Sequence, residues 1–182
     1  TFCSNDNTSY LVMSNIPGGS SISAFGGLTF IPSGVGSLNM FFTPSLVSPN
    51  APANQFFIVN LFNGCSSRFN YTLKQAPVIQ TIPDAFCSND NGQYLLGQYP
   101  SAGLDIGGNG LTIQDQGDGT SKVFFAPAGL GAGPHTLTVF SNGCSTSKTV
   151  TINLPPVFDP NLPTTFCSND NTSYLVMSNI PG

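Results

Sequence analysis

The chain has 182 residues, of which only 7% are charged, and its formal net charge is −4 with four Lys and Arg in all. Four scattered cations exclude the clustered basic face that nucleic-acid binding requires, and they argue against binding to an anionic membrane surface. Because 40% of the residues are hydrophobic and 15 are Phe, the composition is too apolar for a disordered chain, and we expect it to fold.

The first 18 residues return unchanged at the other end of the chain. Residues 1–18 read TFCSNDNTSYLVMSNIPG, and residues 165–182 repeat them letter for letter. The chain therefore covers one period of 164 residues and the opening of the next. Within the period, Phe2-Cys3-Ser4-Asn5-Asp6-Asn7 recurs as Phe86-Cys87-Ser88-Asn89-Asp90-Asn91. We predict a module A at 1–84, a homologous module B at 85–164, and the first strand of the next copy of module A at 165–182.

The repeated Ser-Asn-Asp-Asn after each first cysteine predicts a turn, because Asn and Asp side chains bond their own backbone. Farther along, short strand patterns alternate with Gly-, Pro- and Asn-rich turns. In module B they cover Lys122–Phe125, His135–Phe140 and Ser147–Leu154. Leu137 and Val139 should point inward, and Asn142-Gly143 is typical of a two-residue hairpin turn. No segment has the apolar spacing of a helix, so the patterns predict an all-β fold with two sheets and about seven strands per module.

Both module boundaries are rich in proline, at residues 75–83 and 154–163. Proline fixes its own φ and biases the preceding residue towards extended conformations. These segments are therefore predicted to be semi-rigid spacers, and repeated domains on such spacers form an articulated rod.

The cysteines are Cys3, Cys65, Cys87, Cys144 and Cys167. Cys167 is the copy of Cys3, so one period holds four cysteines, which allow three pairings. Module homology favours Cys3–Cys65 and Cys87–Cys144, one disulfide stapling each module, and gives Cys167 a partner beyond residue 182. Each bond would stabilise its module by about 4 kcal/mol and would indicate an oxidising, extracellular compartment. No CxxC spacing supports a metal site, and we expect no cofactor.

The pattern of module B resembles a known family. Tyr94-Leu95-Leu96-Gly97, Phe125-Ala126-Pro127-Ala128-Gly129 and the turn at 131–136 look like the Ig-like and PKD-like cell-surface repeats of Bacteroidota, which occur in giant adhesins and gliding-motility proteins. Module A lacks the counterparts of Gly97 and of the Gly-x-Gly-x-His-Thr turn. The resemblance implies tandem β-sandwiches at the cell surface, and it carries over no active site.

Candidate sites are sparse. A catalytic triad would depend on the single histidine, His135, whose Gly-Pro-His-Thr setting favours an ordinary turn, so we expect no enzyme. The acidic glycine loop with Asp115 and Asp118, near Asp105 in the sequence, is a weak candidate for Ca²⁺, although two or three carboxylates are fewer than this ion usually takes. The glycosylation pattern N-x-S/T occurs at Asn7, Asn70 and Asn171.

One strand pattern is apolar on both faces. The stretch 56–62 reads FFIVNLF, whereas a sandwich strand normally buries one face only. The side chains in question are Phe56, Phe57, Ile58, Val59 and Phe62. Two interpretations stay open: the outer face is covered within the chain, or it mediates self-association between chains.

Two functional hypotheses follow. The first is a structural repeat unit of a long extracellular adhesin or filament on a bacterial surface, which acts as a stiff spacer. Its partners would be adjacent repeats and neighbouring chains. Residues 165–182 would dock as a strand into another module. The alternative is a carbohydrate-binding module of a surface protein, with exposed Tyr as the platform. An enzyme is the weakest of the three classes.

Overall fold

In the computed structural model, residues 1–24, 26–48, 50–61 and 63–178 are described, and these residues form strands and turns but no helix. The described part of the chain accordingly holds no helix that could cross a membrane. The prediction of an all-β fold is confirmed.

The chain divides into two compact units. Unit 1 comprises Thr1–Val78, Ala102–Asp105 and Phe140–Thr146, and unit 2 comprises Ile79–Ser101, Ile106–Val139 and Ser147–Gly182.

Each module contributes a series of strands in the same order. Module A contains β1 (Phe2–Cys3), β2 (Tyr10–Pro17), β3 (Ser21–Ser23), β4 (Gly26–Gly34), β5 (Ser37–Val47), β6 (Asn54–Asn60) and β7 (Ser66–Lys74). Module B contains β8 (Ala85–Cys87), β9 (Tyr94–Pro100), β10 (Asp105–Gly107), β11 (Leu111–Asp115), β12 (Thr120–Phe125), β13 (Gly133–Ser141) and β14 (Cys144–Asn153). The C-terminal segment adds β15 (Val157–Phe158) and β16 (Met177–Ser178).

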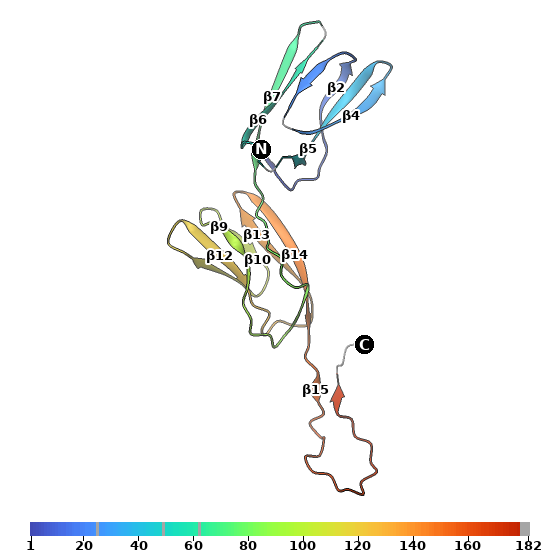
Figure 1. The fold of residues 1–182 in the computed structure, drawn as a ribbon, viewed down its shortest axis with the longest axis vertical. Coiled ribbons are helices and arrows are strands. Elements are labelled where there is room, and N and C mark those ends of the chain that lie inside the picture. Colours follow the sequence, from blue (N-terminus) through green and yellow to red (C-terminus); the bar gives the residue numbers. More distant parts are fainter. Residues whose placement is uncertain (25, 49, 62, 179–182) are drawn as a thin grey trace. The chain divides into compact units, whose positions relative to one another are not determined.

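The two series are connected identically. Module A forms a sheet in the order β1-β7-β6-β3 and another in the order β2-β5-β4, and module B forms β8-β14-β13-β10 and β9-β12-β11 (Figure 1). In each module the first strand runs parallel to the last, β1 with β7 and β8 with β14. Two facing sheets with this arrangement make an Ig-like sandwich. Among the described residues each module thus has the expected strands in two sheets.

The core of unit 1 is aromatic. In β6 the side chains alternate, so Phe57 and Val59 are 2% and 1% exposed, whereas Phe56 and Ile58 are only half-buried. Phe42 of β5 is fully buried, with its ring centroid 4.6 Å from that of Tyr71 and 5.2 Å from that of Phe2. Burying a side chain of this size contributes about 1.5–3 kcal/mol, so these rings supply much of what holds the two sheets together.

Unit 2 repeats this pattern with smaller side chains. Phe125 occupies the place of Phe42, is fully buried and lies 5.3 Å from the ring of Phe86. Leu137 and Val139 of β13 are 0% exposed, which confirms their predicted inward direction. The predicted strands Lys122–Phe125 and His135–Phe140 fall within β12 and β13, and the predicted strand Ser147–Leu154 lies within β14 except for Leu154, which is one residue beyond its end.

The hairpin turn between β13 and β14 also forms as predicted. Asn142 and Gly143 have φ values of 55° and 78°, the left-handed conformation that a two-residue turn needs and that Gly and Asn adopt most readily. This turn places Cys144 directly at the start of β14.

The linker that follows β7 is hydrogen bonded along its length. In unit 1 the Ala76 N–H donates to Ser4 Oγ at 2.9 Å. In unit 2 the Gln80 N–H donates to the Leu96 carbonyl at 2.7 Å, and Ile82 is buried. Lys148 Nζ donates to the Ile82 carbonyl at 3.0 Å and lies 2.7 Å from Asp84. These contacts fix the extended backbone that the prolines favour.

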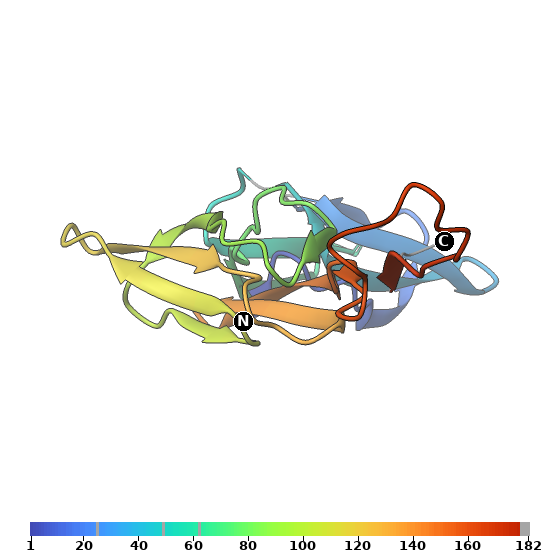
Figure 2. The ribbon, with the colours of Figure 1, turned by 90° about the horizontal axis from the view of Figure 1, so that it is seen from below.

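The C-terminal segment, coloured red, forms a long loop between two short strands (Figures 1 and 2). β15 and β16 pair as short antiparallel strands, with Val157 opposite Ser178 and Phe158 opposite Met177. Residues 159–176 between them form no strand. The docking of residues 165–182 into another module stays a prediction.

Candidate functional site

The repeated cysteine motif folds into the same turn three times. In each copy the aspartate N–H donates to the carbonyl of the cysteine three positions earlier, at 3.0 Å for Asp6, Asp90 and Asp170. Its Oδ1 accepts a backbone N–H two residues later, from Thr8, Gly92 or Thr172, at 2.8–2.9 Å. The turn predicted from Ser-Asn-Asp-Asn is thus present in every copy.

A tyrosine closes each turn. Tyr10, Tyr94 and Tyr174 donate their hydroxyl to Oδ2 of the aspartate four positions earlier, at 2.7–2.8 Å. The ring of each tyrosine also packs against the phenylalanine before the cysteine, at centroid distances of 5.1, 4.7 and 5.2 Å. We call this arrangement of Phe, Cys, Asp and Tyr the cysteine turn. Because the last copy forms it without a surrounding sandwich, the turn depends on local interactions.

The hydrogen bonds change the acidity of both partners. Donation from the Thr8 N–H and the Tyr10 hydroxyl lowers the pKa of Asp6, and donation from the Tyr94 hydroxyl and the Gly92 N–H lowers that of Asp90. Conversely, the bond to its carboxylate raises the pKa of Tyr94. The carboxylates are therefore ionised and bound within the turns at neutral pH, which holds the cysteine backbone in one conformation.

The disulfide does not follow the predicted pairing. Cys3 is bonded to Cys144, with 5.7 Å between their Cα atoms, whereas Cys65, Cys87 and Cys167 are free and exposed. The predicted pairs Cys3–Cys65 and Cys87–Cys144 are wrong in this structure, and so is the expectation of one disulfide within each module. The bond instead joins the first strand of module A to the β13–β14 hairpin of module B, both within unit 1.

Strand register explains why the predicted pairs do not form. Cys3 lies opposite Lys74 at the end of β7, whereas Cys65 immediately precedes the start of that strand. Nine residues at about 3.3 Å each separate the two cysteines by roughly 30 Å, and a disulfide requires Cα atoms within about 7 Å. Cys87 lies opposite Asn153 at the end of β14, which begins at Cys144, so the same geometry separates the second pair.

Polar contacts surround the bond that does form. Asn5 Nδ2 donates to the Ser145 carbonyl at 2.7 Å and to Thr146 Oγ1 at 3.3 Å. Cys144 is only 3% exposed, and its Sγ lies 3.9 Å from the Lys74 carbonyl. Asn5 was not among the predicted site residues, although an asparagine recurs two residues after each first cysteine, at Asn5, Asn89 and Asn169.

The apolar strand β6 presents a mixed outer face. Phe57 and Val59 point into the core, whereas Phe56 and Ile58 on the other face are half-buried. The guanidinium of Arg68 lies 4.0 Å from the centre of the Phe56 ring. Phe62 lies outside the described residues. Phe56 is thus partly covered within the chain, while self-association through this face stays a prediction.

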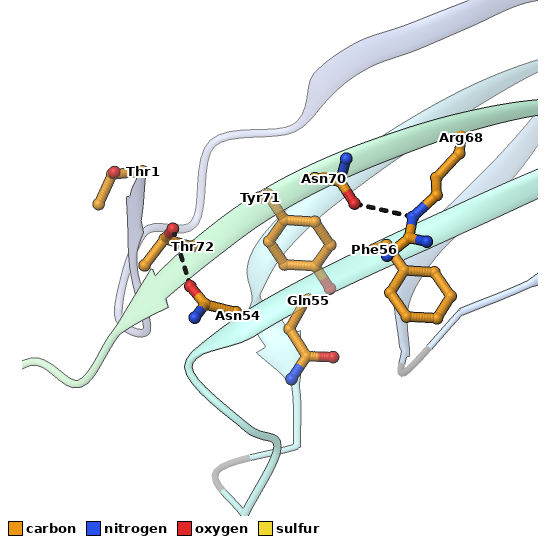
Figure 3. A pocket seen from close by; sticks show the side chains of 8 residues that line it. All are labelled: Thr1, Asn54, Gln55, Phe56, Arg68, Asn70, Tyr71 and Thr72. Carbon is orange, nitrogen blue, oxygen red and sulfur yellow. Dashed lines mark hydrogen bonds between the residues drawn. The ribbon is translucent and has the colours of Figure 1, made fainter.

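A hollow lies along β6 and β7, and side chains from both faces of these strands line it (Figure 3). The hollow has a volume of about 400 Å³ and is lined by Thr1, Asn54, Gln55, Phe56, Arg68, Asn70, Tyr71 and Thr72. Arg68 Nε donates to Asn70 Oδ1 at 2.8 Å, and Thr72 Oγ1 donates to Asn54 Oδ1 at 3.4 Å, as Figure 3 shows. An aromatic ring beside amide and guanidinium groups is chemically suited to a polar, ring-shaped ligand.

The acidic glycine loop folds as a hydrogen-bonded turn. Asp115 Oδ1 accepts the Gly117 N–H at 3.0 Å, and Asp118 Oδ1 accepts the N–H and the hydroxyl of Thr120 at 2.9 and 2.5 Å. The bond from the Thr120 hydroxyl is the main reason that the pKa of Asp118 is lowered. Throughout the described ranges, no three His, Cys, Asp or Glu side chains come together as metal ligands, so Asp105 does not complete a site.

The remaining candidates lie on the surface. His135 Nε2 is 2.8 Å from the Gly131 carbonyl, the contact of a turn histidine. The glycosylation candidates Asn7, Asn70 and Asn171 are all exposed. Nothing in the structure tests whether they are modified, and the modification stays a prediction.

No protein family and no curated protein matches the chain. Among solved structures, it is similar to Bacteroides ovatus SGBP-B in complex with a mixed-linkage heptasaccharide, at 12% identity and TM-score 0.30, over 84% of this chain and 43% of that protein. It also matches the titin Ig tandem A164–A165, at 8% identity and TM-score 0.30 over 85% and 92% of the two chains. It matches the titin I-band fragment I67–I69 at 11% identity and TM-score 0.31, over 86% of this chain and 63% of that fragment.

With TM-scores of 0.30–0.31, these likenesses support no conclusion about the fold or the role of this chain, and the chain spans less than half the length of the Bacteroides ovatus protein. The strand order of the described residues confirms the predicted Ig-like sandwich fold, and the resemblance to gliding-type adhesins stays a prediction. The chain is an all-β protein with tandem Ig-like β-sandwich topology and a disulfide between Cys3 and Cys144.

Proposed function

We propose that the chain is a structural repeat unit of a long extracellular adhesin or filament on a bacterial surface, and that its modules are stiff, disulfide-linked spacers without catalytic activity. The observation that carries this proposal is the bond between Cys3 and Cys144, which connects the first strand of module A to the β13–β14 hairpin of module B. An oxidised cysteine pair fits an extracellular compartment.

The bond changes how the chain responds to tension. A pull on Thr1 passes through Cys3 and Cys144 into β14, because this covalent path is shorter than the 141 residues of backbone between the cysteines. The segment inside that loop contains β2–β13 and both sheets of module A. Tension applied at the chain ends therefore cannot extend it, and this property suits a spacer that holds a cell to a surface under load.

Single-molecule force spectroscopy tests this role, with handles attached before Thr1 and after Gly182. The oxidised protein should extend only through residues outside the loop. Reduction should release an additional length of roughly 480 Å, which is 141 residues at about 3.4 Å each. The double variant Cys3→Ser/Cys144→Ser should extend fully without reductant, whereas Cys65→Ser should behave like the unaltered protein. Full extension of the oxidised protein would contradict the proposal.

A carbohydrate-binding role is the second candidate, favoured by the hollow along β6 and β7. Phe56 offers an aromatic surface there, and Asn54, Arg68 and Asn70 offer hydrogen-bonding groups. A glycan array with the whole chain should show saturable binding that Phe56→Ala abolishes. Phe30→Ala, which removes another exposed aromatic ring, is the matched control and should leave binding intact. An array without saturable binding would eliminate this candidate.

A further inference from the structure

We propose that the three free cysteines make the bond seen between Cys3 and Cys144, each with a module outside this chain, so that the repeats form a disulfide ladder. In this ladder the first cysteine of every module bonds the hairpin cysteine of the module that follows. Cys87 then pairs with Cys65 of the next copy, and Cys167 with the counterpart of Cys144 in the next period. The inference rests on the proposed function, since it requires modules arranged in series.

The first argument is that both modules place their cysteines alike. The first cysteine pairs with the last residue of the final strand, Cys3 with Lys74 and Cys87 with Asn153. The hairpin cysteine precedes or begins that strand, about 30 Å away, so it cannot reach the first cysteine of its own module. Each module therefore carries one cysteine at each end of its sandwich, and both cysteines must find their partners in other modules.

The second argument is that the contacts around the existing bond are encoded again at the free cysteines. Asn5, which donates to Ser145 and Thr146, stands two residues after Cys3. Asn89 and Asn169 stand at the same distance after Cys87 and Cys167. On the hairpin side, Ser66 and Ser67 follow Cys65 as Ser145 and Thr146 follow Cys144. Ser66 and Ser67 thus supply a carbonyl and a hydroxyl for Asn89 that correspond to the two acceptors of Asn5.

The third argument concerns preorganisation. Cys87 and Cys167 sit in the same cysteine turn as the bonded Cys3, with the Asp90 and Asp170 bonds at the same lengths as that of Asp6. Cys65, Cys87 and Cys167 are exposed, whereas the bonded Cys144 is almost fully buried. The turns therefore hold Cys87 and Cys167 in the same backbone arrangement as the bonded Cys3, and all three free thiols are accessible to a partner.

Bond formation requires an oxidant, and we assign that role to a small-molecule disulfide or a thiol–disulfide oxidoreductase of the extracytoplasmic space. The thiolate of Cys87 attacks the oxidant's disulfide and releases one thiol. The thiolate of Cys65 from the neighbouring copy then attacks the Cys87 sulfur of this mixed disulfide and releases the second thiol. Two cysteines lose two electrons and two protons, and the oxidant is reduced to two thiols.

The test uses the whole chain in a Cys167→Ser background, which leaves free thiols only at Cys65 and Cys87. In a glutathione redox buffer at high protein concentration, we expect a series of disulfide-linked oligomers on non-reducing electrophoresis. Adding Cys65→Ser or Cys87→Ser should leave monomers, because each joint needs one cysteine of each kind. Mixing these two variants should give a dimer and nothing larger, with a Cys65–Cys87 peptide detected by mass spectrometry.

Several results would overturn the proposal: oligomers from either single variant, Cys65–Cys65 or Cys87–Cys87 peptides, or unaltered protein that stays monomeric. Asn89→Ala should slow bond formation about fivefold, the effect of one lost hydrogen bond, whereas Asn5→Ala should not change it. The force experiment reports only the Cys3–Cys144 bond within one chain. A ladder that fails while that bond still blocks extension refutes this inference and leaves the proposed function standing.

Discussion

Cys3, at the end of the first strand of the chain, is bonded to Cys144, at the first residue of β14, although 141 positions separate them in the sequence. The bond encloses nearly all of modules A and B in one covalent loop. Its consequences for stability can be separated from those of the free cysteines, because Cys65 and Cys87 are exposed and unbonded.

Removal of this disulfide should destabilise unit 1. For Cys3→Ser/Cys144→Ser we expect the free energy of unfolding to fall by about 2–5 kcal/mol, since closing a long loop restricts the unfolded chain. Thermal unfolding followed by near-UV circular dichroism, in dilute protein, measures the change. Cys65→Ser/Cys87→Ser is the matched control and should unfold like the unaltered protein. Equal losses in both double variants would show that the bond does not stabilise the unit.

The cysteine turn should be visible in the titration of Asp90. Its pKa lies below the ordinary value of about 3.9, so the turn contributes stability above that pH and loses it as the pH falls through the lowered pKa. Tyr94→Phe removes the main cause and should raise the pKa of Asp90 towards the ordinary value. The carboxyl ¹³C shift in NMR measures it, with Asp6 as an internal control whose pKa should stay the same.

At high pH the stability that the turn contributes falls as the pH rises, the opposite of its behaviour in acid. The hydrogen bond to Asp90 raises the pKa of Tyr94. The stability contributed by this bond is therefore complete below the ordinary tyrosine pKa of about 10, and it is lost as the pH rises through the raised pKa. The ultraviolet absorbance of tyrosinate should reveal this late titration. Asp90→Asn should restore ordinary titration of Tyr94; an unchanged midpoint would mean that the bond to Asp90 does not raise its pKa.

Each unit should respond to the loss of its own central phenylalanine. Phe42→Ala and Phe125→Ala both empty a fully buried position, and each should cost about 3–5 kcal/mol in its unit. Native-state hydrogen exchange resolves the two, because amides of β5–β7 should lose protection in the first variant and those of β12–β14 in the second. Phe30→Ala, at a 42% exposed position, should cost about 1 kcal/mol or less.

Lys148 should stabilise unit 2 through its hydrogen bond to Ile82 more than through its ion pair with Asp84. The Asp84 side chain is 88% exposed, so Asp84→Asn should cost less than about 0.5 kcal/mol, and less still at high salt. Lys148→Met also leaves the Ile82 carbonyl without its donor and should cost about 1 kcal/mol more. Chemical denaturation at two salt concentrations measures both; equal costs would contradict this ranking.

Much of this protein follows from local sequence alone. Alternation of Thr with Leu137 and Val139 was sufficient to predict a strand and its buried face, because side chains in a strand point to opposite sides in turn. Asn142-Gly143 predicted the hairpin, and Ser-Asn-Asp-Asn predicted a turn after the cysteine, although not the tyrosine that closes it. The strand, the hairpin and the turn each depend on residues only a few positions apart. The self-repetition likewise showed that the chain consists of related modules.

The disulfide pairing was decided by tertiary structure. Homology shows that Cys3 corresponds to Cys87 and Cys65 to Cys144, but it contains no information on which end of the sandwich each occupies. The parallel pairing of β1 with β7 places Cys3 beside Lys74, a full strand length from Cys65. Because a disulfide joins only atoms that are already close, this register excludes the pairing within a module that sequence homology favoured.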